Sequence, residues 1–143
     1  SRLTELEGAL GIGQLEARGS MLSDRRKNAK YLMDGLSKHS KHIQLPSWPT
    51  HSEHSFMMFP IVIKDHNKGK TEIVNFLETH NIETRDLFYG PKKQPILKHL
   101  LGKDSLPNTD HISKHRLYLP SGLATTKEEI ERVIESIKQI IKK

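Results

Sequence analysis

The chain has 143 residues, 34% of them hydrophobic and 28% charged, and a formal net charge of +6 at pH 7. This length is typical of a single domain with a modest core. The absence of cysteine excludes disulfide bonds and thiolate metal sites, and no apolar run approaches the roughly 18 residues of a membrane span. We therefore expect a cytoplasmic protein that neither enters a membrane nor binds a metal.

The positive charge is scattered, because Lys and Arg alternate with Asp and Glu along most of the expected helices. Only KDHNKGK at 64–70 and KQIIKK at 138–143 are locally basic. Aromatic residues make up 6% of the chain and do not interleave with basic ones, so a platform for stacking bases is not indicated. We expect no nucleic-acid partner.

The first 37 residues predict two consecutive helices, or one long bent helix, ending near Ser37. Leucines recur at helical spacing, which predicts one buried face. Four glycines interrupt the pattern, and each costs about 1 kcal/mol relative to alanine inside a helix. Such glycines indicate a bend, or close approach by another backbone or a ligand. The residues concerned are Leu3, Leu6, Leu10 and Leu15, and Gly8, Gly11, Gly13 and Gly19.

Turn-forming residues dominate 38–55, which predicts a surface connection with a short extended piece at 43–45. Four histidines lie here in two pairs spaced three apart, His39 with His42 and His51 with His54. The segment lacks a helical period, and no carboxylate completes a ligand set. We therefore expect exposed histidines and not a metal site.

The continuous apolar run at 56–63 predicts a strand buried on both faces. Pro60 has no N–H to donate, so it is expected at a bulge or facing an unpaired side. Helical spacing then runs to Asn81. The expected elements after it are a strand at 82–88, short helices at 94–101 and 106–115, and a strand at 116–120.

The last helix is the clearest element. Either Thr125 or Thr126 caps it, with Glu128 or Glu129 as the partner in a capping box. Isoleucine and valine then recur on one face. Three strands crossed by helices predict a small α/β (α+β) layer covered by helices, with long helices at both ends.

Few residues suggest chemistry by themselves. The sequence has no glycine-rich phosphate loop of standard spacing. Arg85 in a strand, and Lys92 beside Tyr89 in a turn, are plausible contacts for an anion. Each is at least as well explained as ordinary surface charge, with Arg85 paired to a neighbouring carboxylate.

Four stretches carry a family resemblance. They are SRLTELEGALGIGQLEARGSMLSDRRKNAKYLMDGL, HSFMMFPIVI, NIETRDLFYGPKKQP and LPNTDHISKHRLYLPSGLATTKEEIERVIESI. In this order, and along nearly the whole chain, they resemble the C-terminal part of the DegT/StrS family of sugar aminotransferases that depend on pyridoxal 5'-phosphate (PLP).

The resemblance implies the small C-terminal domain of the type I PLP-transferase fold. Residues 1–37 would form the interdomain helix or helix pair, and 38–143 the α/β layer. The catalytic N-terminal domain, with the cofactor lysine, would lie upstream. The implied enzyme is a homodimer that transfers an amino group from glutamate to a nucleotide-linked keto-sugar. We expect the 143 residues alone not to transaminate, and assign them no catalytic residue.

The resemblance also implies roles for single residues. Arg2 matches the arginine of the family's N-x-R motif and would lie near the cofactor phosphate. Arg85, Tyr89 and Lys92 would contact the substrate. Lys92 stands where the family usually has histidine, which puts the usual sugar-nucleotide contact in doubt.

Two alternatives stay open. The stretches TRDLFYG and LPNTD also resemble the sugar 3-dehydrase branch of the family, in which a hydroxyl is removed and no amine is added. A non-catalytic binding or dimerisation domain is the alternative from another class.

Overall fold

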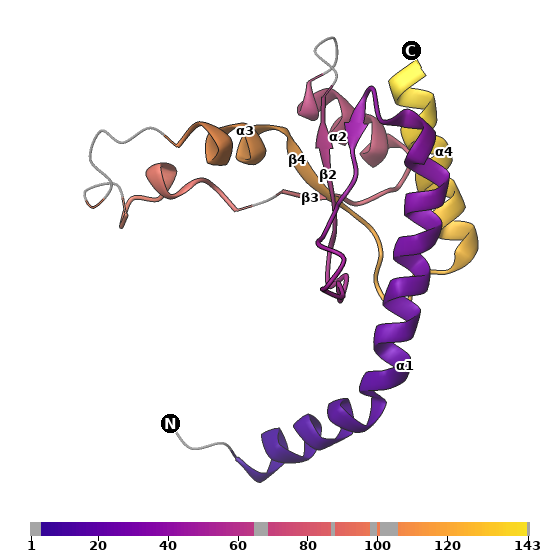
Figure 1. The fold of residues 1–143 in the computed structure, drawn as a ribbon, viewed down its shortest axis with the longest axis vertical. Helices are drawn as coiled ribbons and strands as arrows, with labels where there is room; N and C mark the ends of the chain where they lie inside the picture. Colours follow the sequence, from indigo (N-terminus) through magenta and orange to yellow (C-terminus); the bar gives the residue numbers. More distant parts are fainter. Residues whose placement is uncertain (1–3, 65–68, 87, 98–99, 101–105, 143) are drawn as a thin grey trace.

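The computed structural model describes residues 4–64, 69–86, 88–97, 100 and 106–142. In this part of the chain, helices flank a four-stranded antiparallel sheet (Figure 1). The elements are α1 (Glu5–Leu36), η1 (Ser37–His39), β1 (Ile43–Gln44), β2 (Phe59–Ile63), α2 (Lys70–Thr79), β3 (Arg85–Asp86), η2 (Pro91–Lys93), α3 (Pro107–His115), β4 (Arg116–Leu119) and α4 (Lys127–Lys142).

The strand order is β1-β2-β4-β3, so the two most buried strands lie at the centre of the sheet. The predicted mixed class of helices and strands is confirmed. The sheet has one strand more than the three predicted, because the short extended piece expected at 43–45 pairs with Val62 and Ile63 as the edge strand β1.

Strand β2 is shorter than the apolar run that predicted it. Phe56 has a φ of 49°, in the left-handed region, and the chain enters the ladder only at Phe59. Pro60 pairs with Tyr118 of β4 but lies beyond the residues that β1 covers. The predicted strand at 82–88 contributes only β3.

Helix α1 is one long helix that bends along its length (Figure 1). Its C-terminal half lies beside α4, where Ala29, Leu32 and Leu36 are buried in the core. The prediction of a buried face on the N-terminal half is wrong for this chain, because no described segment packs against it. Its leucines are 63–72% exposed, namely Leu6, Leu10 and Leu15. Leu3 lies outside the described residues.

Of the two alternatives expected for the early glycines, α1 shows a bend (Figure 1), and a close approach by another part of the described chain is not found. Apart from the adjacent backbone of α1 itself, no heavy atom of the described residues lies within 4 Å of a Cβ placed on the glycines at 8, 11, 13 and 19. The tight position is Gly35, where an added Cβ would lie 2.5 Å from Cδ1 of Ile134. Among the glycines of α1, the one in contact with another element is therefore Gly35, at the crossing of α1 and α4.

Helix α4 follows its prediction closely. Thr126 and Glu129 form the capping box, with the Thr126 amide donating to Glu129 Oε2 at 2.8 Å and the Glu129 amide donating to Thr126 Oγ1 at 3.2 Å. The apolar face is buried at Ile130, Val133, Ile134, Ile137, Ile140 and Ile141.

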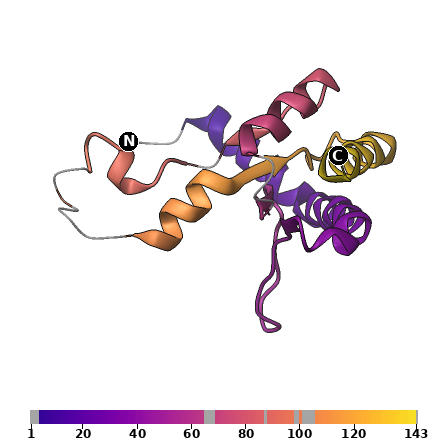
Figure 2. The same ribbon diagram turned by 90° about the horizontal axis from the view of Figure 1, so that it is seen from above.

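The described residues between β3 and β4, which include η2 and α3, extend away from the sheet (Figures 1 and 2). The predicted helix at 106–115 is confirmed as α3, with Pro107 in its first turn. The helix predicted at 94–101 is wrong, because its described residues form successive turns, with Leu97 N–H donating to the Gln94 carbonyl and Leu100 N–H to that of Leu97. Residues 98, 99 and 101 lie outside the described part.

Candidate functional site

A pocket of about 340 Å³ lies at one end of the sheet, around Arg85. We call it the Arg85 pocket. It brings together α1, the entry to β2, the short strand β3 and the loop between β4 and α4. Its lining residues are Arg25, Met57, Met58, Glu83, Arg85, Tyr118, Leu119, Pro120, Ser121 and Gly122.

Strand β3 sets the position of Arg85, which lies opposite Tyr118 of β4 in the ladder. The Arg85 side chain is 68% exposed, and its Nε lies 3.9 Å from Glu83 Oε1. Asp86, the other carboxylate considered as its partner, pairs instead with Lys70 at 2.8 Å. A salt bridge to Glu83 is therefore present, but it is long and solvent-exposed, and such pairs hold a side chain weakly.

Arg25 forms a second guanidinium in the same pocket. Its Nη1 donates to the carbonyl of Met57 at 3.0 Å and to that of Phe56 at 3.4 Å. These bonds fix α1 to the chain that enters β2. No role was predicted for Arg25 from the sequence. The paired arginines in the first family-like stretch were the signal that would have singled it out.

The loop between β4 and α4 is held by a buried amide. Nδ2 of Asn28 donates to the carbonyl of Gly122 at 3.0 Å and to that of Thr125 at 3.4 Å. Asn28 is only 9% exposed, so these bonds compensate the loss of its hydration. They place Ser121 and Gly122 on the wall of the Arg85 pocket.

Tyr89 lines a different pocket, of about 360 Å³, which we call the Tyr89 pocket. It lies between the 88–94 segment and α3, and Gln94 Nε2 donates to the Tyr89 carbonyl at 3.1 Å. Its lining residues are Phe88, Tyr89, Gly90, Pro91, Gln94, Thr109, Ile112 and Ser113. It shares no residue with the Arg85 pocket.

The structure thus separates the predicted site residues. Arg85 and Tyr89 line different pockets, and Lys92 lies in η2 without lining either of them. Arg2 lies outside the described residues. Among the described residues, no group of three His, Cys, Asp or Glu side chains is placed to hold a metal ion. Among the described helices, none has the length and apolar character needed to cross a bilayer.

The expectation of exposed histidines at 38–55 holds for His51 and is wrong for His39, His42 and His54, which are half-buried. His54 is half-buried, and its ring centroid lies 4.4 Å from that of Phe56. Its Nδ1 accepts a hydrogen bond from the Phe56 amide at 2.9 Å, so Nε2 carries the proton of the neutral ring.

Comparison with known proteins agrees with the resemblance in sequence. A lipopolysaccharide biosynthesis protein of Salmonella typhimurium, RfbH, is 28% identical over 142 residues, which cover 96% of this chain and 32% of that protein. The dTDP-4-dehydro-2,6-dideoxy-D-glucose 3-dehydratase of Saccharopolyspora spinosa is 32% identical over 146 residues, 99% of this chain and 31% of the relative. The chain therefore spans about a third of the length of the curated relatives it matches.

Solved structures have the same fold. DesV of S. venezuelae, in complex with a ketimine intermediate, aligns with a TM-score of 0.88 at 21% identity, covering 99% of this chain and 38% of DesV. The E. coli GDP-4-keto-6-deoxy-D-mannose-3-dehydratase with bound hydrated PLP aligns with a TM-score of 0.76 at 26% identity, covering 92% of this chain and 34% of that one. The fold is that of the corresponding part of the type I PLP-dependent enzymes.

One family description covers nearly all of the chain. The profile of the DegT/DnrJ/EryC1/StrS aminotransferase family matches residues 1–138. The match includes α1, the whole sheet and most of α4. This chain belongs to the DegT/DnrJ/EryC1/StrS aminotransferase family.

Proposed function

We propose that the chain is the C-terminal part of a PLP-dependent enzyme that transfers an amino group from glutamate to a nucleotide-linked keto-sugar. The family membership supports this proposal, and so does the share of the relatives that the chain spans. Two GDP-perosamine synthases are among the relatives, and that of Vibrio cholerae is 25% identical over 138 residues. A homodimer in the cytoplasm, with the remaining catalytic groups upstream, belongs to the same proposal.

The observation that carries the proposal is the pair of guanidinium groups in the Arg85 pocket. Arg25 is held by two backbone carbonyls, whereas Arg85 has one distant partner and a mostly exposed side chain. A guanidinium binds a phosphate through two parallel N–H donors. We assign Arg85 to the phosphate or sugar of the substrate, with Arg25 shaping the wall behind it.

Tyr89 and Lys92 are proposed as outer substrate contacts. They lie on the segment that extends from the sheet, and Tyr89 is 69% exposed. Lys92 provides a mobile point charge that suits a phosphate. Arg2 is proposed to lie near the cofactor phosphate of the neighbouring subunit.

The described residues fit one wall of a cofactor site and not the whole of it. Two arginines border an open pocket and suit an anionic group, whereas no described lysine is buried. When bound, PLP supplies the electron sink for chemistry next to an amine. The role proposed for this chain is to orient the substrate and to exclude water from that group.

Removal of a hydroxyl group is the second candidate function. The relatives named as 3-dehydratases are 32%, 29% and 27% identical to this chain, whereas the two GDP-perosamine synthases are 25% and 23% identical. In this version the chain would bind the same class of substrate, and the product would be a deoxy-sugar without a new amine.

The complete protein that carries this chain tests both candidates. It would be incubated with PLP, glutamate and a panel of GDP- and dTDP-linked 4-keto-6-deoxy sugars, and the products identified by mass spectrometry and NMR. A new amino group supports the transferase, loss of water supports the dehydratase, and turnover of no nucleotide sugar contradicts both.

Substitution of Arg85 tests its assigned role. We expect Arg85→Ala to raise the KM for the nucleotide sugar by about tenfold or more, and Arg85→Lys to recover only part of the loss. Lys38→Ala removes an exposed cation from another part of the chain and is the matched control. An unchanged KM in Arg85→Ala would remove Arg85 from the substrate site while leaving the reaction class untouched.

A further inference from the structure

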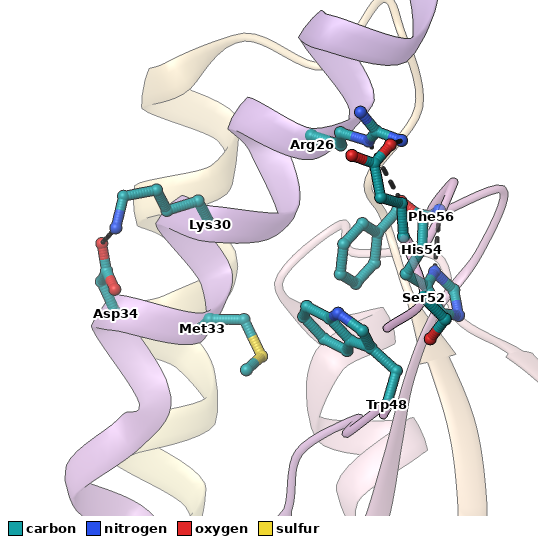
Figure 3. A pocket seen from close by; sticks show the side chains of 9 residues that line it. Arg26, Lys30, Met33, Asp34, Trp48, Ser52, His54 and Phe56 are labelled. Atoms are coloured by element: carbon teal, nitrogen blue, oxygen red, sulfur yellow. Dashed lines mark hydrogen bonds and ion pairs between the residues drawn. The ribbon is translucent and has the colours of Figure 1, made fainter. Parts of the chain in front are cut away.

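A third pocket, of about 450 Å³, lies between α1 and the 46–56 segment (Figure 3). We call it the Trp48 pocket. Figure 3 shows side chains from α1 on one side and side chains from the 46–56 segment on the other. Its lining residues are Arg26, Lys30, Met33, Asp34, Trp48, Ser52, Glu53, His54 and Phe56. None of these residues lines the Arg85 or Tyr89 pocket, so the roles proposed above do not account for it.

The wall formed by the 46–56 segment is held in place by specific bonds. Arg26 Nε donates to the His54 carbonyl at 3.2 Å, and its Nη2 lies 2.7 Å from Glu53 Oε2. Nδ1 of His54 accepts a hydrogen bond from the Phe56 amide, and this bond stabilises the left-handed backbone conformation at Phe56. An unusual backbone conformation held by side chains from two segments is typical of functional sites. A wall ordered in this way loses little entropy when a ligand binds.

Trp48 provides the apolar surface of this pocket. Its indole packs edge-on against Phe56, with 5.2 Å between ring centroids and an angle of 84° between the planes. Phe56 is 5% exposed and belongs to the core, whereas Trp48 is 40% exposed. One aromatic ring is thus anchored by the core and still offers surface to a ligand. The indole N–H of Trp48 makes no hydrogen bond to another described residue.

The rim carries four charges that cancel. Arg26 pairs with Glu53, and Lys30 Nζ lies 3.2 Å from Asp34 Oδ2. The two cations are therefore already neutralised, and the pocket has no net charge with which to attract a phosphate chain. The same four side chains, with Ser52, present hydrogen-bond donors and acceptors around the apolar ring.

We propose that the Trp48 pocket binds a neutral sugar ring. A pyranose has a face of C–H groups and a rim of hydroxyls, which matches one exposed indole surrounded by paired donors and acceptors. The volume lies within the range of about 300 to 1,000 Å³ that is usual for small-molecule sites. The inference does not depend on the proposed enzymatic function, because it assigns a binding site to residues that the reaction does not use.

A nucleobase is the competing ligand, and the geometry favours it less. Bases bind best where a planar ring is open for stacking, with further planar groups on the other side. Here Phe56 is covered by its own packing, and Met33 is the apolar residue that α1 contributes to the lining. A single exposed ring with a polar rim suits a ligand that has one apolar face.

The full chain can be titrated directly, because Trp48 is the single tryptophan in the sequence. Its fluorescence would be followed on addition of the methyl α-pyranosides of glucose, galactose and mannose, with uridine and glucose 6-phosphate as comparison ligands. We expect a saturable change with at least one neutral pyranoside and a Kd of about a millimolar, which is usual for one ring. Glucose 6-phosphate should bind no more tightly than the pyranosides.

Two variants test whether the sugar binds at the Trp48 pocket, and saturation-transfer NMR on the sugar protons measures binding to each of them. Trp48→Leu keeps an apolar side chain and should abolish the saturable signal. Asp34→Asn leaves the aromatic wall intact and should weaken binding about threefold, because it exchanges an ionic acceptor for a neutral one. Leu123→Ala, which removes a partly exposed apolar side chain elsewhere, should bind as the unchanged chain does. Circular dichroism would verify that each variant is folded. If Trp48→Leu does not fold, the loss of affinity in Asp34→Asn tests the proposal instead.

Three results would overturn the proposal. One is that none of the pyranosides gives a saturable change in fluorescence. Another is a saturable response to uridine alone, which would assign the pocket to a base. The third is undiminished binding in a folded Trp48→Leu or Asp34→Asn variant, which would place the sugar elsewhere on the chain.

Discussion

At the scale of single residues, the glycines of α1 differ in how closely other side chains approach them. Four glycines in the first half of α1 border open space among the described residues, whereas Gly35 lies against Ile134 of α4. A methyl group added in the open region costs no contact and removes backbone freedom from the unfolded chain. The same methyl group at Gly35 has to displace a buried side chain.

We expect Gly13→Ala to raise the free energy of unfolding by about 0.5 to 1 kcal/mol, because alanine is the better helix former. Gly35→Ala should lower it by about 1 kcal/mol, because overpacking against Cγ1 and Cγ2 of Ile134, each 3.0 Å from the added Cβ, outweighs the gain in propensity. Urea unfolding followed by circular dichroism measures both. Stabilisation by both substitutions would show that Ile134 moves aside without cost.

The cap of α4 gives a second prediction at this scale. Thr126→Ala removes the hydroxyl that accepts the Glu129 amide, so it should cost about 1 kcal/mol of stability. Thr125→Ala is the matched control, because the Thr125 hydroxyl does not accept the Glu129 amide. Its loss should change stability by less than about 0.5 kcal/mol. The same unfolding measurement separates the two, and a larger loss in Thr125→Ala would assign the cap to the other threonine.

At the scale of elements, the C-terminal ends of α1 and α4 bring positive charges together. Burial is the main cause that lowers the pKa of His39, followed by the charges of Lys138, Lys142 and His42, while Glu135 acts in the opposite direction. Glu135, Lys138 and Lys142 are about a hundred residues from His39 in sequence. Their proximity depends on the packing of α4 along α1.

The lowered pKa of His39 predicts a pH dependence of stability. Because the unfolded chain takes up the proton at higher pH than the folded chain, stability should fall as the pH drops below about 6.5. His39→Gln should reduce this fall between pH 7 and pH 5, as measured by urea midpoints. His51→Gln replaces an exposed histidine and should leave the fall unchanged. An equal fall in all three proteins would contradict a role for His39.

At the scale of the whole molecule, the 143-residue chain leaves two apolar surfaces uncovered. One is the N-terminal half of α1, with exposed leucines, and the other lies on the segment between β3 and β4. That second surface includes Phe88, Tyr89, Ile96 and Leu100, each at least 69% exposed. Apolar surfaces of this kind favour association.

We expect this chain by itself to self-associate through α1. Replacing Leu6, Leu10 and Leu15 together by glutamine should shift it toward the monomer in size-exclusion chromatography with light scattering. The matched variant replaces Phe88, Ile96 and Leu100 by glutamine and should leave most of the association in place. If only this second variant becomes monomeric, the segment between β3 and β4 is the contact surface.

Much of the fold was predictable because its elements follow local rules. The apolar period and capping box of α4, the short strand at 116–120 and the turn residues at 38–55 each depend on residues close in sequence, and these predictions are confirmed. The strand at 56–63 was placed correctly but begins late, since the backbone at Phe56 follows its contacts with His54 and Arg25. Periodicity also predicted a buried face on the first half of α1 without specifying what would bury it.

The sequence alone determined the family, the mixed class of fold, and the positions of most helices and strands, because those depend on neighbours along the chain. Only the tertiary structure decided that Arg25 meets the carbonyl of Met57, that Asn28 holds the loop at Gly122, and that Gly35 is the crowded glycine. These contacts join residues 32 to 99 positions apart, counted from Arg25 to Met57 and from Gly35 to Ile134. Contacts between residues so distant in sequence depend on how whole helices pack against each other and against the sheet. A local sequence pattern does not specify that packing.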